Sequence, residues 1–235
     1  MRRQFRQFIL NMRSRPRPSL NLLLMLLALT ACQNPVKKAI RNTQYSAYEL
    51  VGVQKRDLLK TRVEDARDDQ KEAGEEFTDA LTQLKKVYGF DGGDLEREYD
   101  QLRKSYERTS HQAEDVQKSI RRVETVAQDL FDEWEAELKQ IETPALKTRS
   151  QASLSSTKAR FEELRESLKA SEARMAPVLR KFNDHVLYLK HNLNARAISS
   201  LKGEALKISN DIESLIADMN KSIASSNKFI ESMPQ

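Results

Sequence analysis

The strongest constraint on the fold is a stretch between residues 95 and 134 in which apolar or small side chains recur at alternating steps of four and three. Its members are Leu95, Tyr99, Leu102, Tyr106, Thr109, Ala113, Val116, Ile120, Val123, Ala127, Leu130 and Trp134. This spacing places all of them on one side of an α-helix. Such a stripe is buried only when a partner helix lies along its whole length, as in a coiled coil. The stretch therefore predicts a long helix that packs against others.

Three further segments show the same spacing. Their stripes are Leu59, Val63, Ala66, Gln70, Ala73, Phe77, Ala80, Leu84 and Val87 in the first, Leu154, Thr157, Phe161, Leu164, Leu168, Ser171, Met175, Val178, Phe182, His185 and Leu189 in the second, and Ile198, Leu201, Ala205, Ile208, Ile212, Leu215, Met219, Ser222 and Ser226 in the third. Charged residues make up 32% of the chain and aromatic residues only 6%, which suits solvated helices better than sheets. We therefore predict an all-α fold, an elongated antiparallel bundle or coiled coil of four long helices.

Two of the three connections between these helices have clear turn signals. Residues 89–94 include three glycines that can adopt positive φ, and Asp94 can cap the helix that follows. Thr143 and Pro144 place an N-cap residue before a proline at the first helical position. Because both connections are short, the helices that they join must be antiparallel neighbours. The third connection, at residues 192–194, has neither glycine nor proline, so three helices with a long bent last helix are the alternative.

The first three helices are expected to be about 45–48 residues long, roughly 70 Å, and to pack in full register. Pro177 is expected to kink the third of them or to remove one of its backbone hydrogen bonds. An acidic run at residues 64–76 of the first helix lies opposite basic side chains of the second in this register. We expect ion pairs from this run to Lys118, Arg121 and Arg122.

The first 31 residues have the layout of a bacterial secretion signal. They contain six arginines and no acidic residue, and they include an apolar run from Leu20 to Leu29 that is too short to span a bilayer. The run ends in Leu29-Thr30-Ala31-Cys32, which matches the lipobox of bacterial lipoproteins. In that chemistry the Cys32 thiol takes a diacylglycerol, a peptidase cuts between Ala31 and Cys32, and an acyl chain is added to the freed amine. Several acyl chains then hold the protein at a membrane.

The predicted domains are a signal peptide at 1–31, a membrane-proximal tether at 32–42 and a helical-bundle domain at 43–235. Gln33, in place of Asp, favours the outer membrane over the inner one, by resemblance to Gram-negative lipoproteins. The long leader is explained either by a weak twin-arginine pattern at Arg2 and Arg3 or by a start of translation at Met12. Basic residues in the tether either attract anionic lipid or keep a linker solvated.

The net charge of the chain is misleading when taken as a whole. A formal charge of +5 by itself favours a nucleic-acid partner. Six of the basic residues lie in 1–31, however, so residues 32–235 hold 34 basic and 35 acidic side chains, a net charge of −1. We therefore expect no nucleic-acid partner.

The chain offers little for catalysis. His111, His185 and His191 have no metal-binding spacing, and His185 lies on a stripe where a structural histidine is expected. The single cysteine, Cys32, is consumed by lipid in the prediction above. Neither a Gly-x-Ser-x-Gly elbow nor a Gly-x-x-x-x-Gly-Lys phosphate loop occurs. We therefore expect no catalytic residue, no metal, and no cofactor besides the covalent diacylglycerol and acyl chain on Cys32.

One stretch departs from the regular heptad pattern. Residues 185–196 mix aromatic, amide and basic side chains, and function tends to lie where a sequence departs from a local rule. This stretch is interpreted either as a polar-capped turn between two helices or as a surface that binds a partner protein. The candidate residues of such a surface are Tyr188, Lys190, His191, Asn192, Asn194 and Arg196.

Several runs of the chain also carry a resemblance to a known family. They lie at residues 48–57, 63–66, 90–95, 131–135 (Phe131-Asp132-Glu133-Trp134-Glu135) and 187–197. In these runs the chain resembles a proteobacterial family known only as domain of unknown function 2959, over nearly the whole of residues 32–235. The resemblance implies a lipoprotein of this layout, and it supplies no activity, cofactor or catalytic residue.

Two functional hypotheses follow. The first is a non-enzymatic lipoprotein, held by its lipid anchor on the periplasmic face of the outer membrane, whose helical scaffold binds an envelope protein. The alternative is a cytoplasmic coiled-coil protein that assists DNA repair or another DNA transaction. Steep salt dependence of DNA binding would distinguish the second from the first.

Overall fold

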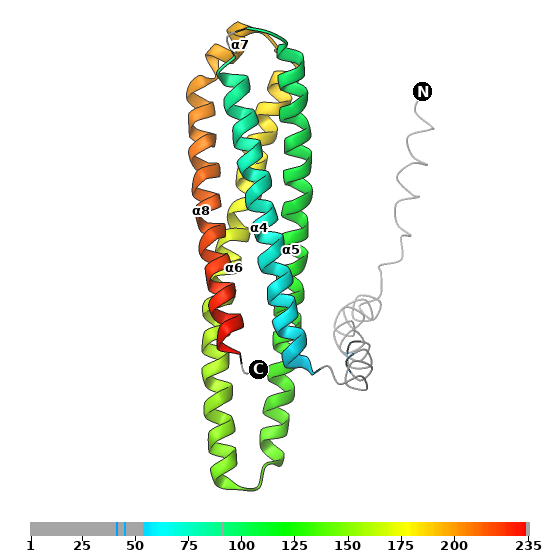
Figure 1. The fold of residues 1–235 in the computed structure, drawn as a ribbon, viewed down its shortest axis with the longest axis vertical. Helices are drawn as coiled ribbons and strands as arrows, with labels where there is room; N and C mark the ends of the chain where they lie inside the picture. Colours follow the sequence, from blue (N-terminus) through cyan, green and yellow to red (C-terminus); the bar gives the residue numbers. More distant parts are fainter. Residues whose placement is uncertain (1–40, 42–44, 46–53, 91, 234–235) are drawn as a thin grey trace, which may run out of the picture. The chain divides into compact units, whose positions relative to one another are not determined.

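A computed structural model describes residues 41, 45, 54–90 and 92–233 of the chain. The chain divides into two compact units, residues 1–54 and residues 55–235, and the second contains the long helices. Its helices, drawn in Figure 1, are α4 (Lys55–Tyr88), α5 (Leu95–Gln140), α6 (Pro144–His191), α7 (Ala195–Ser200) and α8 (Lys202–Ser232). No strand occurs among the described residues.

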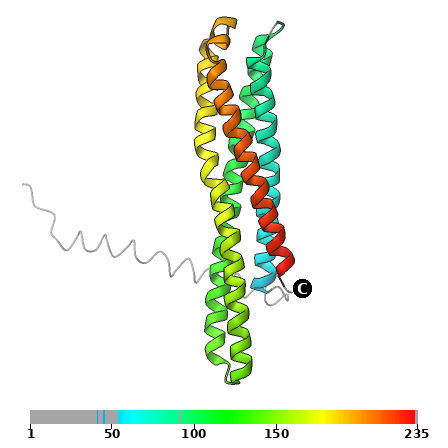
Figure 2. The same cartoon turned by 90° about the vertical axis from the view of Figure 1, so that its left-hand side faces the viewer.

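The four long helices form an antiparallel bundle. Extensive contacts join α4 to α5, α5 to α6, α6 to α8 and α8 to α4, so α4 and α6 lie on one diagonal of the bundle and α5 and α8 on the other. Figures 1 and 2 show the same arrangement from two directions. The predicted all-α bundle of four long helices is thus confirmed. Because α6 ends at His191 and the short α7 separates it from α8, the alternative with one long bent last helix is wrong.

The buried core follows the predicted stripes closely in α4. All nine stripe positions of α4 are fully buried, including the amide side chain of Gln70. The stripes of α6 and α8 also line the core, with Phe182, Leu189, Ile212 and Leu215 completely inaccessible to solvent. An apolar side chain buried in this way contributes about 1.5–3 kcal/mol of stabilisation. The heptad pattern therefore locates most of the residues that hold the bundle together.

The stripe of α5 departs from the prediction near its C-terminal end. Leu130 and Trp134 are only partly buried, whereas Phe131 and Leu138 take the inward positions. Trp134 instead reaches α6, where its Nε1 donates a hydrogen bond to Ser150 Oγ at 2.8 Å. A side chain in this position contacts one neighbouring helix and leaves its other side accessible to solvent.

The prediction of three equally long helices in full register is wrong. Helix α4 has 34 residues and α8 has 31, whereas α5 has 46 and α6 has 48. The hairpin of α5 and α6 therefore extends past the ends of the other two helices, as Figures 1 and 2 show. At the start of α4, Lys55 Nζ lies 2.6 Å from Glu133 Oε1, which places that start seven residues before the end of α5. The regular stripe of the first segment begins only at Leu59, so the pattern supports no earlier start.

The turn signals were predicted correctly. Gly92 and Gly93 have φ of +156° and +111°, and Asp94 Oδ1 accepts a hydrogen bond from Arg97 N at 3.0 Å. Thr143 is the N-cap of α6 with a proline at the first helical position, although its side chain makes no capping hydrogen bond. Helix α6 runs continuously through Pro177, whose nitrogen has no hydrogen to donate to the preceding turn.

Candidate functional site

The predicted lipidation and cleavage site lies outside the described residues. Ala31 and Cys32 precede Arg41, the first residue that the structure describes. Within the described part of the chain, no helix is long and apolar enough to cross a membrane. The lipid anchor therefore stays a prediction from the sequence.

The six candidate residues of the partner surface lie together around the turn that joins α6 to α8. Two of them act on the turn itself. Asn192 Nδ2 donates a hydrogen bond to the Tyr188 carbonyl at 3.0 Å, which helps to end α6. Asn194 Oδ1 accepts from Ala197 N at 3.0 Å, which caps α7. The interpretation as a polar-capped turn is therefore confirmed for these two amides.

The other four candidate residues point away from the core. Tyr188 is 40% exposed, and Lys190, His191 and Arg196 are exposed as well. In the region that the structure describes, none of these four side chains makes a hydrogen bond or an ion pair. The structure thus separates the candidate set into two residues that build the turn and four that remain available to solvent.

A groove of about 370 Å³ lies beside this turn, between α6 and the beginning of α8. Its residues are Lys181, Asp184, His185 and Tyr188 from α6 and Leu201, Glu204, Lys207 and Ile208 from the α8 side. Sequence reasoning found only Tyr188 as a candidate here. The spacing of Lys181, Asp184 and Tyr188 marks a common helix face, but nothing local reveals that the start of α8 lies opposite.

Among the residues that line this groove, His185 contacts the last residue of α4. Its Nδ1 shares a hydrogen bond of 2.6 Å with Tyr88 Oη, and the two rings meet edge to face with centroids 5.5 Å apart. Burial lowers the pKa of His185, against the opposing effect of the carboxylates of Glu204 and Asp184. Burial also raises the pKa of Tyr88 well above its usual range, and Tyr188 adds to the rise. Both groups are therefore neutral near pH 7, as a structural pair requires.

The prediction that His185 is structural is supported by this pairing. None of the described residues belongs to a group of three or more histidine, cysteine, aspartate or glutamate side chains placed to hold a metal ion. The half-buried imidazole instead links α6 to the end of α4 on the bundle diagonal.

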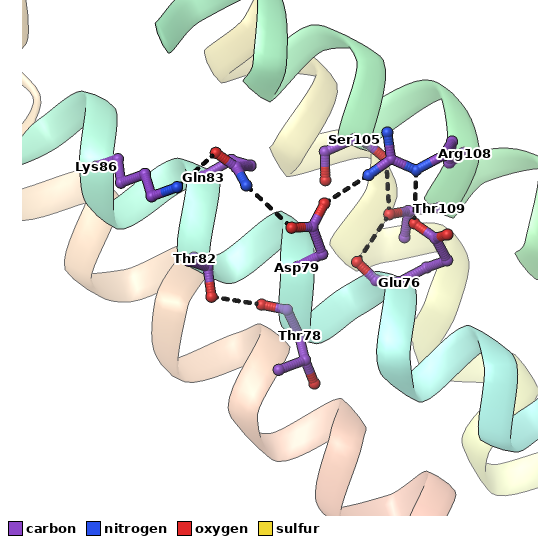
Figure 3. Close-up of polar contacts among 9 residues, drawn as sticks. All are labelled: Glu76, Thr78, Asp79, Thr82, Gln83, Lys86, Ser105, Arg108 and Thr109. Atoms are coloured by element: carbon purple, nitrogen blue, oxygen red, sulfur yellow. Dashed lines mark hydrogen bonds and ion pairs between the residues drawn. The ribbon is translucent and has the colours of Figure 1, made fainter.

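Basic residues of α5 pair with part of the acidic run of α4, as expected. The main contact, however, comes from Arg108, which was not among the residues expected. Figure 3 shows Arg108 between two carboxylates, with Nε 3.0 Å from Glu76 Oε2 and Nη2 2.5 Å from Asp79 Oδ2. Of the residues named in advance, Arg122 lies 3.7 Å from Asp69, whereas Lys118 pairs with Asp115 of its own helix. Thr109, beside Arg108, donates to carbonyls of both helices at 3.2 and 2.8 Å. These contacts fix the register of α4 against α5.

Comparison with known proteins places the chain in a family. No curated protein matches it. The model of a family described as "Protein of unknown function (DUF2959)" matches residues 44–233, which include all five helices described above. The match covers most of the 235-residue chain, and it agrees with the resemblance found in the sequence runs. The chain therefore belongs to the DUF2959 family of proteins of unknown function.

Proposed function

We propose that the protein is a lipid-anchored lipoprotein of the bacterial cell envelope, attached to the outer membrane on its periplasmic face. The observation that carries the proposal is the order of an arginine-rich leader, a short apolar run and Leu29-Thr30-Ala31-Cys32. Each part has a separate chemical role in export, cleavage and acylation. The same 31 residues account for the positive charge of the whole chain, since residues 32–235 carry a net charge of −1.

The helical bundle would serve as a scaffold that binds an envelope protein, with no catalytic role of its own. In support, polar side chains inside the bundle make contacts that hold its helices together. Gln70 Nε2 donates to Ser171 Oγ at 3.1 Å across the core, and His185 pairs with Tyr88. The exposed residues of the α6–α8 turn are the part of the scaffold that we assign to the partner.

The length of α4 supports this assignment. The chain enters the bundle at Lys55, whereas the α6–α8 turn lies beside Tyr88 at the other end of α4. At 1.5 Å per residue, 34 helical residues separate these two ends by about 50 Å. A partner that contacts the turn would thus be held about 50 Å from Lys55, where the chain enters the bundle.

Membrane fractionation of the Cys32→Ser variant tests the anchor. The wild-type protein should sediment with membranes in high salt and accumulate as an uncut precursor when the lipoprotein signal peptidase is inhibited by globomycin. The Cys32→Ser variant should fail to undergo lipid-dependent cleavage and, still held by its uncut apolar run, should remain in the inner-membrane fraction.

The Ala31→Gly variant is the matched control, because it keeps a small residue before the cleaved bond and should behave as the wild type does. Recovery of Cys32→Ser in the outer-membrane fraction, to the same extent as the wild type, would contradict the proposal.

A further inference from the structure

The end of α6, the α6–α8 turn and the start of α8 form a basic region on a helical bundle that is otherwise acidic. Residues 180–207 contain six basic side chains and two acidic ones, a net charge of +4. Since residues 32–235 as a whole carry −1, the remainder of that range carries −5. The basic side chains are Arg180, Lys181, Lys190, Arg196, Lys202 and Lys207.

Most of this positive charge is not neutralised within the protein. Lys181 pairs with Asp211 at 2.6 Å and Lys207 with Glu204 at 2.7 Å. The other four cations are exposed, and none of them has a carboxylate within ion-pair distance in the described ranges. Three of these four cations, Lys190, Arg196 and Lys202, lie at the turn, and Arg180 lies on α6 before it. Unpaired cations attract an anionic partner over a distance of about 10 Å at moderate salt.

Apolar side chains are exposed at the same end of the bundle. In the part of the chain that the structure describes, four large apolar side chains are exposed, and Leu187, Tyr188 and Leu206 are three of them, at 51%, 40% and 68%. Tyr188 also lines the groove between α6 and α8, together with Leu201 and Ile208. The volume of this groove, about 370 Å³, is sufficient for one or two large side chains of a partner.

We infer that this turn binds an acidic protein segment, which places an apolar side chain in the groove between α6 and α8. The unpaired cations select the charge of the segment, and the apolar residues of the groove bind its anchoring side chain. A recessed site between two helices fits a peptide better than a flat lipid surface does. The inference rests on the partner-binding part of the proposed function, and it is independent of the lipid anchor.

Selection from a library of displayed random 12-residue peptides, with full-length protein in nonionic detergent as the bait, tests the inference. The selected peptides should be acidic and should share one large aliphatic or aromatic residue. Their binding, measured by fluorescence anisotropy, should weaken as salt rises from 50 to 300 mM, because exposed charge pairs are screened.

Two charge-reversal variants decide where the peptides bind. Changing Arg180, Lys190 and Arg196 together to Glu should weaken binding about tenfold or more, because three exposed attractions become repulsions.

The matched control changes Lys139, Lys147 and Arg149 to Glu at the far end of the α5–α6 hairpin. These residues are also exposed, so the control alters the net charge equally, and it should leave peptide binding unchanged. Tyr188→Ala should weaken binding without changing the far-ultraviolet circular dichroism.

Several outcomes would overturn the inference. The inference fails if the selected peptides are basic or share no apolar residue. It also fails if the two charge-reversal variants weaken peptide binding equally. Binding of the protein to phosphatidylglycerol vesicles, lost in the turn variant while no peptide is selected, would assign the surface to lipid. Self-association that the same variant abolishes would assign it to a second copy of the chain. Each of these results can occur whether or not the Cys32 fractionation supports the anchor.

Discussion

Replacing Gln70 with Leu tests the energetics of the bundle core. Gln70 lies on the α4 stripe with no accessible surface. Its Nε2 donates to Ser171 Oγ at 3.1 Å, but its Oε1 has no hydrogen-bond partner among the described residues. Ser171 Oγ has a second role, since it donates to the Leu168 carbonyl of its own helix at 3.1 Å. Removing the amide therefore leaves Ser171 with its acceptor.

The expected change in stability can be worked out from these contacts. A neutral buried hydrogen bond contributes about 1 kcal/mol, whereas an unpaired buried acceptor costs about 1–3 kcal/mol. Leu has a similar size to Gln and adds buried apolar surface. We therefore predict that Gln70→Leu stabilises the bundle by about 1–2 kcal/mol. For a unit of this size that raises Tm by about 2–8 °C.

Thermal and urea unfolding, followed by circular dichroism at 222 nm, measures this change. Gln70→Ala is the control: it removes the same amide but leaves a void, and it should be less stable than Gln70→Leu by about 2 kcal/mol or more. If Gln70→Leu is less stable than the wild type, the pair with Ser171 contributes net stability and the reasoning fails.

Three further predictions concern local features of the fold. Because burial depresses the pKa of His185 below its ordinary 6.5, the unfolded chain takes up the proton first. The free energy of unfolding should therefore be highest above about pH 7.5 and should fall as the pH drops through 6.5. Urea titrations should show a smaller fall in the His185→Gln variant than in the wild type. An equal fall in both would exclude this histidine as its source. Asp94→Ala removes the cap on Arg97 N and should cost about 1 kcal/mol in the same assay, while an unchanged midpoint would mean that the cap is dispensable. Gly93→Ala should cost about 1–2 kcal/mol because its φ is +111°, whereas Gly203→Ala, in open space on α8, should stabilise by about 0.5–1 kcal/mol; the opposite order of Tm would contradict the backbone argument.

Features that depend on one helix at a time could be predicted from the sequence. The heptad stripe located the buried positions of α4 because burial repeats with the helical period. Asp94 was predicted as a cap because it acts on a backbone group only three residues away. Family membership was likewise found from local runs of residues, and the match over residues 44–233 confirms it.

Features that depend on how two helices are offset were not predicted. The pairing of Arg108 with Glu76 and Asp79 requires the register of α4 against α5, which a seven-residue repeat leaves free to slip by whole heptads. The groove beside Tyr188 joins residues from α6 and α8 that only the turn between them brings together. The shift of burial from Leu130 to Phe131 likewise depends on where the neighbouring helices lie, which the stripe alone does not specify.

The measurement that tests the central proposal most directly is mass spectrometry of the N-terminal peptide from membrane-extracted protein. Digestion with trypsin should release residues 32–37, with Cys32 as the first residue, carrying a thioether-linked diacylglycerol and an acyl chain on its amine. The Cys32→Ser variant should yield no such modified peptide. Recovery from the wild type of an unmodified peptide that contains residues from both sides of the Ala31–Cys32 bond would contradict the lipoprotein proposal.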